Sequence, residues 1–318
     1  MKKLHLFIQI IIGVSIIAFI LNKLNLNEIF EVLKKTDLSY FIMACLSYLF
    51  LDLILALRLS YLLKKIGHEM KLKDVFLSHM GGMIIGDITP GRSGYFLTPL
   101  ILRKKSGVPI TEGMACIFAP QGIEFILKVA GAVAAIIYLS FYLNIEKNFI
   151  IYAGIGSVIL LVVGILMLLV SWNNEKMTSK FLVRIPFLNK FTENLSSFKD
   201  RSILIKDSLN IILILYTMGW IFAALQWYFL GKAIGIEISF FIFFLLHPLI
   251  TILMFVPLSP AGLGLMEGGI ILVFSFFGIS PALGMAFSVL VRVSILVVDI
   301  IGLKTVISVS GRTQSEEW

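Results

Sequence analysis

The sequence predicts an all-α integral membrane protein with six full transmembrane helices and two broken, re-entrant helical hairpins. Of its 318 residues, 58% are hydrophobic and only 14% are charged, against roughly 25% charged residues in soluble globular chains. The mean hydropathy is +0.98, and several apolar stretches reach the about 20 residues that a helix needs to cross a bilayer. Proline and glycine interrupt two further apolar stretches. These observations exclude a water-soluble fold.

Six apolar stretches are long enough to cross the bilayer as continuous helices. They are Leu4 to Leu21, Leu38 to Leu63, Ile110 to Leu143, Asn148 to Trp172, Ile203 to Leu230 and Pro281 to Val309. Lys2 and Lys3 precede the first stretch as in a signal peptide, but no small-residue cleavage pattern follows. We therefore expect a retained anchor helix.

A short amphipathic segment follows the anchor helix. Leu26, Ile29, Phe30 and Leu33 recur at helical spacing, opposite a polar face formed by Asn27, Glu28 and Glu31. This pattern predicts an interfacial helix over Leu26 to Leu33 that lies flat on the membrane. The anchor and interfacial helices occupy residues 1–37 of a single membrane domain, residues 1–318.

Two apolar regions, Val75 to Leu102 and Phe240 to Phe277, are broken near the middle. The first contains Thr89-Pro90-Gly91-Arg92-Ser93-Gly94, and the second contains Pro257-Leu258-Ser259-Pro260-Ala261-Gly262-Leu263-Gly264. Because proline removes a backbone donor and glycine destabilises a helix interior, we expect a helical hairpin in each region. Non-helical backbone at membrane depth is tolerated only where it lines a cavity or is buried in protein. The breaks are therefore where a functional site is expected.

The two broken regions resemble copies of each other. Pro90 and Gly94 match Pro260 and Gly264. Gly107, Gly113, Met114 and Ala115 match Gly278, Gly284, Met285 and Ala286 at the same internal spacing. With three crossings between them, residues 71–143 and 238–309 would form an inverted repeat, the arrangement in which transporters place a site near the midplane.

The distribution of basic residues predicts the orientation. With the N-terminus inside, the inside segments carry Lys2, Lys3, Lys64, Lys65, Lys71, Lys73, Arg103, Lys104, Lys105, Lys176, Lys180, Arg184, Lys190, Lys199, Arg201, Lys304 and Arg312. The outside segments carry only Lys23, Lys34, Lys35, Lys147 and Lys232. Because cytoplasmic loops are rich in Lys and Arg, we expect both termini and an amphipathic loop at 173–202 to be cytoplasmic, in a plasma membrane protein. Since the basic residues flank apolar runs, the net charge of +8 does not indicate nucleic-acid binding.

Ionisable residues inside the apolar stretches mark the candidate site, since each costs roughly 2.5 to 3.5 kcal/mol on insertion scales. Arg92 and Glu267 lie at the breaks, where helix N-termini favour an anion. We expect a lipid-headgroup site lined by Arg58, Pro90, Gly91, Arg92, Ser93, Gly94, Ser259, Pro260, Gly262, Gly264, Glu267 and Arg292. Secondary buried charges are Asp52, Glu124, Lys128 and Asp299. The alternatives are internal pairing of these charges, snorkelling, and close helix packing at the glycines.

Enzyme chemistry has little support in the sequence. His79 and His247 show no metal-ligand spacing with carboxylates, and neither a nucleophile elbow nor a phosphate loop is present. Asp52 and Glu124 are the only candidates for a catalytic acid or base, and neither has a recognisable partner. Cys45 and Cys116 lie inside apolar stretches as packing residues. We expect no cofactor and no metal site.

The motif Pro257 to Glu267, followed by Arg292, resembles the C-terminal signature of the lysylphosphatidylglycerol synthase transmembrane (flippase-like) family. The segment Thr89 to Gly94, with the basic stretch Arg103 to Lys105, is similar to its N-terminal motif, and Arg58 also fits. The resemblance covers nearly the whole chain. It departs from the family at Pro120-Gln121, where members usually have a Glu-Arg pair, and this departure leaves the headgroup open.

The resemblance implies a membrane domain like the flippase half of the bacterial multiple peptide resistance factor. The separate soluble domain of that factor transfers lysine from tRNA to phosphatidylglycerol, and the chain to Trp318 has no room for it. We therefore expect a lipid flippase for an anionic or aminoacylated phospholipid. The alternative is a non-transporting accessory or scaffold protein in phospholipid or polyprenyl-phosphate metabolism, a lipid class implied by relatives fused to glycosyltransferases. Expected partners are membrane lipids, with a lipid-modifying enzyme or a second copy of the chain as further candidates.

Overall fold

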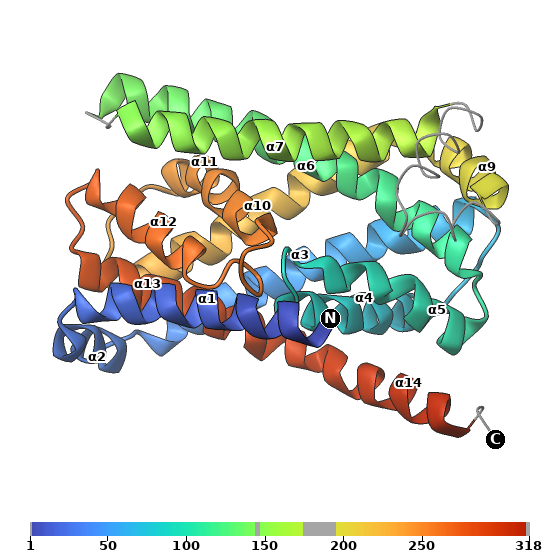
Figure 1. Cartoon of the computed structure of the whole chain (residues 1–318), viewed down its shortest axis with the longest axis horizontal. Helices are drawn as coiled ribbons and strands as arrows, with labels where there is room; N and C mark the ends of the chain where they lie inside the picture. The colour runs from blue at the N-terminus through green and yellow to red at the C-terminus, as the bar shows by residue number, and fades with distance from the viewer. Residues whose placement is uncertain (1, 144–146, 174–194, 316–318) are drawn as a thin grey trace.

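The computed structural model describes residues 2–143, 147–173 and 195–315, and throughout these ranges the regular structure is helical (Figure 1). Within this part of the chain, five helices are long and apolar enough to cross a membrane: α3 (Leu38–Lys65), α6 (Ile110–Tyr142), α7 (Lys147–Trp172), α10 (Leu209–Ala233), and α13 (Pro281–Asp299), which continues through η4 (Ile300–Gly302) into α14 (Leu303–Ser315). The predicted all-α membrane class is confirmed.

Among the described residues, the candidate spans number five, or six if the first two helices count as one bent span. α1 (Lys2–Asn22) meets α2 (Leu26–Lys34) at an angle of 94°. The side chain of Asn25 accepts a hydrogen bond from the backbone N–H of Asn27 and so caps α2. Ile29 of α2 is buried against Ala282 and Ala286 of α13, whereas Phe30 is 59% exposed. The amphipathic pattern is therefore used partly to pack α2 on α13.

The span predicted at Ile203 to Leu230 is displaced in the structure. α9 (Leu195–Lys206) ends before Asp207, and α10 begins at Leu209 and runs to Ala233. Asp207 is exposed, whereas Ser208 is buried at the junction of the two helices. Most of the predicted loop 173–202 lies outside the described residues. Its described end, α9, packs against α6 and α7.

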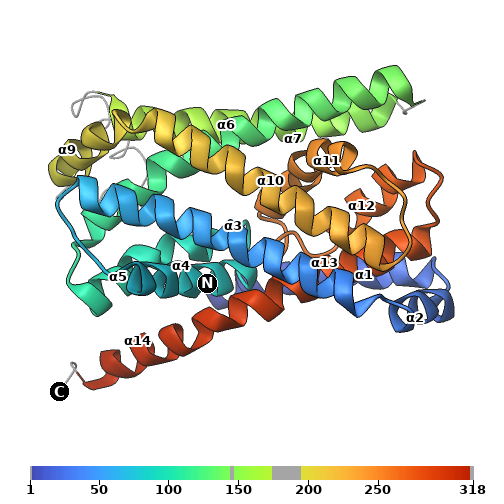
Figure 2. The ribbon, with the colours of Figure 1, turned by 180° about the vertical axis from the view of Figure 1, so that it is seen from behind.

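Helices α6 and α7 form an antiparallel pair along one side of the molecule, and α3 and α10 lie side by side behind them (Figures 1 and 2). A Cβ atom on Gly122 would lie 2.9 Å from the carbonyl oxygen of Gly164, and the reverse distance is also 2.9 Å. The two backbones can approach this closely because neither residue has a side chain, as is common between membrane helices.

The two broken regions occupy opposite ends of the helix bundle (Figure 1). α4 (Leu72–Asp87) is separated by residues 88–92 from η1 (Ser93–Leu97) and α5 (Thr98–Ser106). α11 (Phe240–Thr251) and η3 (Ile252–Phe255) are separated by residues 256–264 from α12 (Leu265–Ser275). Neither region is a continuous helix, as Pro and Gly predict.

The two breaks touch each other. Pro90 and Pro260 form an isolated antiparallel bridge, and the backbone N–H of Ala261 donates to the carbonyl of Thr89 over 3.1 Å. The two residues after each of these prolines have positive φ: 60° and 53° at Gly91 and Arg92 in the first break, and 41° and 68° at Ala261 and Gly262 in the second. The local match predicted from the sequence thus extends to the backbone conformation, whereas the larger inverted repeat stays a prediction.

Aromatic rings fix the second broken region to the bundle. The Phe287 ring of α13 lies 5.5 Å from Trp227 of α10, 5.8 Å from Phe243 of α11 and 4.9 Å from Phe274 of α12, measured between ring centroids. All four side chains are almost fully buried. Ring contacts of this geometry add to the packing energy, so this aromatic cluster holds four helices together.

Candidate functional site

A cavity of about 140 Å³ lies between α3, α6, α10, α11 and the first break. The charged side chains that line it are Arg58, Arg92, Glu124 and Lys128. Tyr95, Tyr216 and Trp220 contribute aromatic lining. The lining therefore carries three cations and one carboxylate, in a part of the protein where an unpaired charge is costly.

Arg58 of α3 is the least compensated of these cations. Arg58 is 2% exposed. Its guanidinium carbon lies 4.3 Å from the centre of the Tyr216 ring, which is a cation–π contact. Its Nε and Nη1 atoms have no hydrogen-bond partner among the described residues. Because an unsatisfied buried donor costs about 1 to 3 kcal/mol, the N–H groups of these two nitrogen atoms are available for a ligand in the cavity.

Glu124 and Lys128 of α6 form an ion pair one helical turn apart, with 3.4 Å between Nζ and Oε1. Glu124 Oε2 accepts hydrogen bonds from the Tyr216 hydroxyl at 2.8 Å and from the Gln121 amide at 3.1 Å. Lys128 also donates to Thr251 over 3.4 Å. Both oxygens of Glu124 are thus occupied, which leaves this carboxylate little capacity for a cationic ligand.

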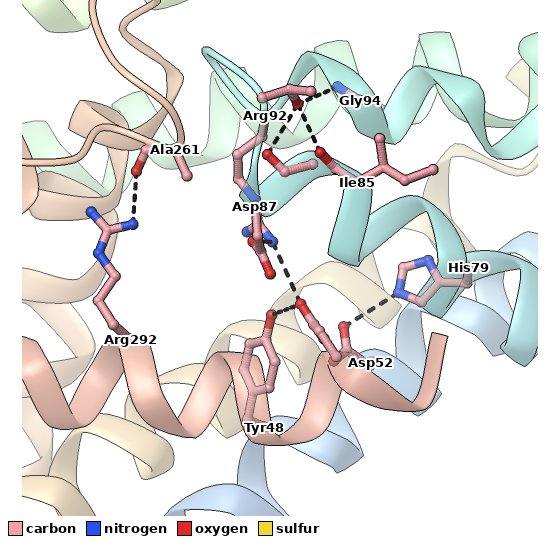
Figure 3. Close-up of polar contacts among 12 residues, drawn as sticks. Tyr48, Asp52, His79, Ile85, Asp87, Arg92, Gly94, Ala261 and Arg292 are labelled. Atoms are coloured by element: carbon pink, nitrogen blue, oxygen red, sulfur yellow. Dashed lines mark hydrogen bonds and ion pairs between the residues drawn. The ribbon is translucent and has the colours of Figure 1, made fainter. Parts of the chain in front are cut away.

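The first break is held by its own polar side chains. Thr89 Oγ1 donates to the carbonyl of Ile85 at 3.0 Å and accepts from the backbone N–H of Gly94 at 2.7 Å (Figure 3). A Cβ atom on Gly94 would lie 2.6 Å from that same carbonyl oxygen. Arg92 Nη2 donates to Asp87 Oδ1 at 2.7 Å and lies 4.0 Å from Asp299 Oδ2 of α13. Arg92 therefore faces the cavity with its charge already neutralised.

In the second break, Glu267 and Arg292, which were predicted to bind the headgroup, bind each other and the backbone instead. Glu267 Oε2 accepts from the backbone N–H of Gly264 at 2.7 Å, and its Oε1 accepts from Arg292 Nε at 2.7 Å. Arg292 Nη1 donates to the carbonyl of Ala261 at 3.1 Å (Figure 3). The start of α12, expected to attract a ligand anion, is thus already occupied by the Glu267 carboxylate.

The glycines and serine of the second break serve local packing. A Cβ atom on Gly262 would lie 2.6 Å from the carbonyl oxygen of Leu253, and one on Gly264 would lie 2.7 Å from Ile16 Cβ of α1. Ser259 is fully buried and donates to the carbonyl of Leu263 over 2.8 Å. These contacts agree with the alternative in which the glycines permit close packing.

The predicted site residues consequently divide into two groups. Arg58, Gly91, Arg92, Glu124 and Lys128 line the cavity, whereas the following residues do not: Asp52, Pro90, Ser93, Gly94, Ser259, Pro260, Gly262, Gly264, Glu267, Arg292 and Asp299.

The comparisons with known proteins agree with this architecture. The lysylphosphatidylglycerol synthase TM region family matches residues 6–302. This chain belongs to that family. A UPF0104 membrane protein of Methanothermobacter thermautotrophicus is 26% identical over 303 residues, which cover 90% of this chain and 89% of that protein. A UPF0104 membrane protein of Methanocaldococcus jannaschii is 25% identical, and the match covers 93% of this chain and 92% of that protein. A UPF0104 membrane protein of Pyrococcus horikoshii is 23% identical, and the match covers 92% of each chain.

The protein is therefore an integral membrane protein of the lysylphosphatidylglycerol synthase TM region family. Gln121, at the position where the resemblance leads us to expect a departure from the family, lines the cavity and donates to Glu124. Among the described residues, no group of three or more His, Cys, Asp or Glu side chains is arranged to hold a metal ion.

Several polar residues of this family member were missed by the sequence reasoning. Tyr48, Tyr95 and Tyr216 cannot be distinguished in the sequence from tyrosines of an interfacial belt, yet Tyr216 contacts both Arg58 and Glu124. Asp87 offered a better signal, because it is an acidic residue near the end of an apolar stretch, five residues before Arg92.

Proposed function

We propose that this protein binds the anionic headgroup of a membrane lipid in the central cavity and moves that lipid between the two leaflets, as a flippase-like transporter. The observation that carries the proposal is Arg58, a buried guanidinium in the cavity wall with two nitrogen atoms that have no hydrogen-bond partner among the described residues. A phosphate oxygen would supply both the missing acceptor and the missing negative charge.

The balance of charge in the cavity favours an anion over a cation. Lys128 is paired with Glu124, and Arg92 is paired with Asp87. Arg58 is then the excess charge in the lining. Removing such a charge from water is costly unless an opposite charge and hydrogen bonds compensate it, so an anionic ligand would stabilise the cavity more than a neutral one.

The volume of the cavity supports a headgroup and not a whole lipid. Pockets for drug-sized ligands have roughly 300 to 1,000 Å³, whereas this cavity has about 140 Å³. A phosphate with a small substituent is of the appropriate size. The acyl chains would then remain outside, in the surrounding bilayer.

The contact between the two breaks supports a site near the bilayer midplane. The Pro90–Pro260 bridge joins segments that carry the same pair of left-handed residues, and the cavity lies beside the first of these segments. This arrangement favours an inverted repeat, in which the two halves exchange their accessibility during transport. The excess of Lys and Arg in the predicted inside segments favours cytoplasmic termini in a plasma membrane protein.

The test is a measurement of lipid movement in reconstituted vesicles. Purified protein is placed in vesicles that contain fluorescent phosphatidylglycerol, and the fraction of probe accessible to an external quencher is followed over time. Arg58→Gln is expected to slow movement about tenfold or more, because a charge-assisted hydrogen bond contributes about 1.5 to 3 kcal/mol. The matched control is Arg103→Gln, since Arg103 is exposed on α5.

Two results would contradict the proposal. The first is wild-type protein that accelerates the movement of no anionic or aminoacylated phospholipid and of no polyprenyl-phosphate. The second is Arg58→Gln with an unchanged rate. Retained binding of an anionic lipid without movement would indicate the non-transporting accessory role instead.

A further inference from the structure

A second polar centre lies beside the first break and shares Arg92 with the cavity lining. The carboxyl groups of Asp87 at the end of α4 and Asp299 at the end of α13 both approach the Arg92 guanidinium, at 2.7 Å and 4.0 Å. The Tyr48 hydroxyl of α3 donates to Asp299 Oδ2 at 3.3 Å. The side chain of Asp87 is 6% exposed and that of Asp299 is fully buried.

Each of these two carboxyl groups has one oxygen that lacks a partner. Asp87 Oδ2 and Asp299 Oδ1 are buried and have no hydrogen-bond donor among the described residues. The two carboxyl groups are neighbours, because both approach the same atom, Arg92 Nη2, from Asp87 Oδ1 at 2.7 Å and from Asp299 Oδ2 at 4.0 Å. Because an ionised carboxylate is acceptor-only, a hydrogen bond between them can form only when one of them is protonated. A single proton would therefore satisfy both oxygens.

The charges around the two carboxyl groups also favour one bound proton for the pair. The titratable or charged groups that face the pair are Tyr48 and Asp52 from α3, His79 from α4 and Arg92 from the break. His79 Nε2 lies 3.3 Å from Asp52 Oδ1 (Figure 3), and its Nδ1 lies 3.2 Å from the Tyr95 hydroxyl. With Asp52 hydrogen-bonded to His79, Asp87 and Asp299 are the two carboxyl groups that remain for the one guanidinium of Arg92. Two carboxylates that share a site cannot both ionise readily.

We propose that the Asp87–Asp299 carboxyl pair binds one exchangeable proton, and that release of this proton loosens the first break. Deprotonation places two carboxylates side by side and removes their shared hydrogen bond, so they separate. Arg92 contacts both, and its segment is bonded to the second break through Pro90 and Pro260. Protonation can thereby shift the contact between the two breaks. That this shift drives lipid movement rests on the proposed function, whereas the proton site itself does not.

A direct test of the site is infrared spectroscopy of the purified protein over a range of pH. A protonated carboxyl group has a carbonyl band that an ionised carboxylate lacks, so titration of the pair changes this band reversibly. Asp299→Asn is expected to remove the titrating band, because an amide keeps the size and hydrogen bonds of a protonated carboxyl. Asp87→Asn is expected to remove it as well.

Two control variants make the infrared result specific. Asp52→Asn is expected to keep the band, since Asp52 is paired with His79. Asp207→Asn is a surface control, since Asp207 is exposed. Absence of a titrating band in the wild type, its loss in Asp52→Asn, or its persistence in both Asp299→Asn and Asp87→Asn would overturn the proposal. A band that is displaced by Na⁺ at constant pH would also overturn it, in favour of a cation site.

The consequence for transport is measured separately in the reconstituted vesicles. The wild-type rate of lipid movement is expected to change at least about fivefold as the pair titrates, whereas Asp299→Asn is expected to move lipid at a rate that no longer depends on this titration. Equal pH dependence in both proteins would overturn the coupling. A titrating infrared band in a protein that moves no lipid would refute the proposed function and leave the proton site in place.

Discussion

The ion pair between Glu267 and Arg292 is expected to stabilise the second break, and Glu267→Gln tests this directly. Glu267 accepts two short hydrogen bonds, from Gly264 and from Arg292, and its side chain is 3% exposed. Glutamine has a single acceptor oxygen, so the variant loses one charge-assisted bond, worth about 1.5 to 3 kcal/mol. It also leaves the Arg292 guanidinium without its counter-charge. The side chain of Arg292 is 21% exposed, which reduces the penalty, so we expect a total loss of about 3 kcal/mol.

The expected loss can be measured as a shift of the unfolding temperature. The entropy of unfolding of a chain of this length is about 0.7 kcal/mol/K, so the midpoint is expected to fall by about 4 to 5 °C. A thiol-reactive dye follows the transition in detergent, because Cys116 is fully buried and Cys45 is partly buried. The matched control is Glu69→Gln, whose ion pair with Lys64 is exposed and contributes at most about 1 kcal/mol.

A double-mutant cycle separates pairing from other effects of the substitution. Arg292→Gln removes the partly buried cation, so the double variant with Glu267→Gln is expected to lose less stability than the two single losses combined. Purely additive losses, or a Glu267→Gln midpoint no lower than that of the Glu69→Gln control, would refute the argument that this pair holds the break.

Three further substitutions test the packing of the fold by the same dye assay. Gly302→Ala places a Cβ atom into the backbone carbonyl oxygen of Met80, so η4 and α4 must separate, and we expect a loss of about 3 kcal/mol. An unchanged midpoint would show that this contact is not rigid. Phe287→Ala removes the centre of the aromatic cluster and is expected to cost about 3 kcal/mol of stability. This is the low end for such truncations, because the environment outside the protein is lipid here and not water. A loss below about 1 kcal/mol would mean that the cluster repacks. Asp37→Ala removes the cap of α3, which accepts from the Ser39 N–H at 2.8 Å, and is expected to cost about 1 kcal/mol; no loss would indicate that water replaces this cap.

The buried charges illustrate how far sequence reasoning reached into the site. Arg58 could be singled out because a guanidinium in an apolar stretch is conspicuous whatever its neighbours are. Glu267 and Arg292 were equally conspicuous, but the sequence did not indicate that they bind each other and the backbone of the second break. Tyr216 was not noticed at all, since a tyrosine in a membrane helix suits many environments. A charged residue inside a membrane helix can therefore be located from the sequence, whereas the residue that it binds cannot.

The membrane class and the two breaks were determined by the sequence alone. Apolar content acts along each stretch, and proline and glycine act on the backbone of their own turn, so consecutive residues are sufficient to predict both. The pairing of Asp87 with Asp299 around Arg92, the contact between Pro90 and Pro260, and the position of the cavity were decided only by the tertiary structure. These features depend on how α3, α4 and α13 are packed. That packing is the combined result of many weak contacts between helices, and no single segment of the chain encodes it.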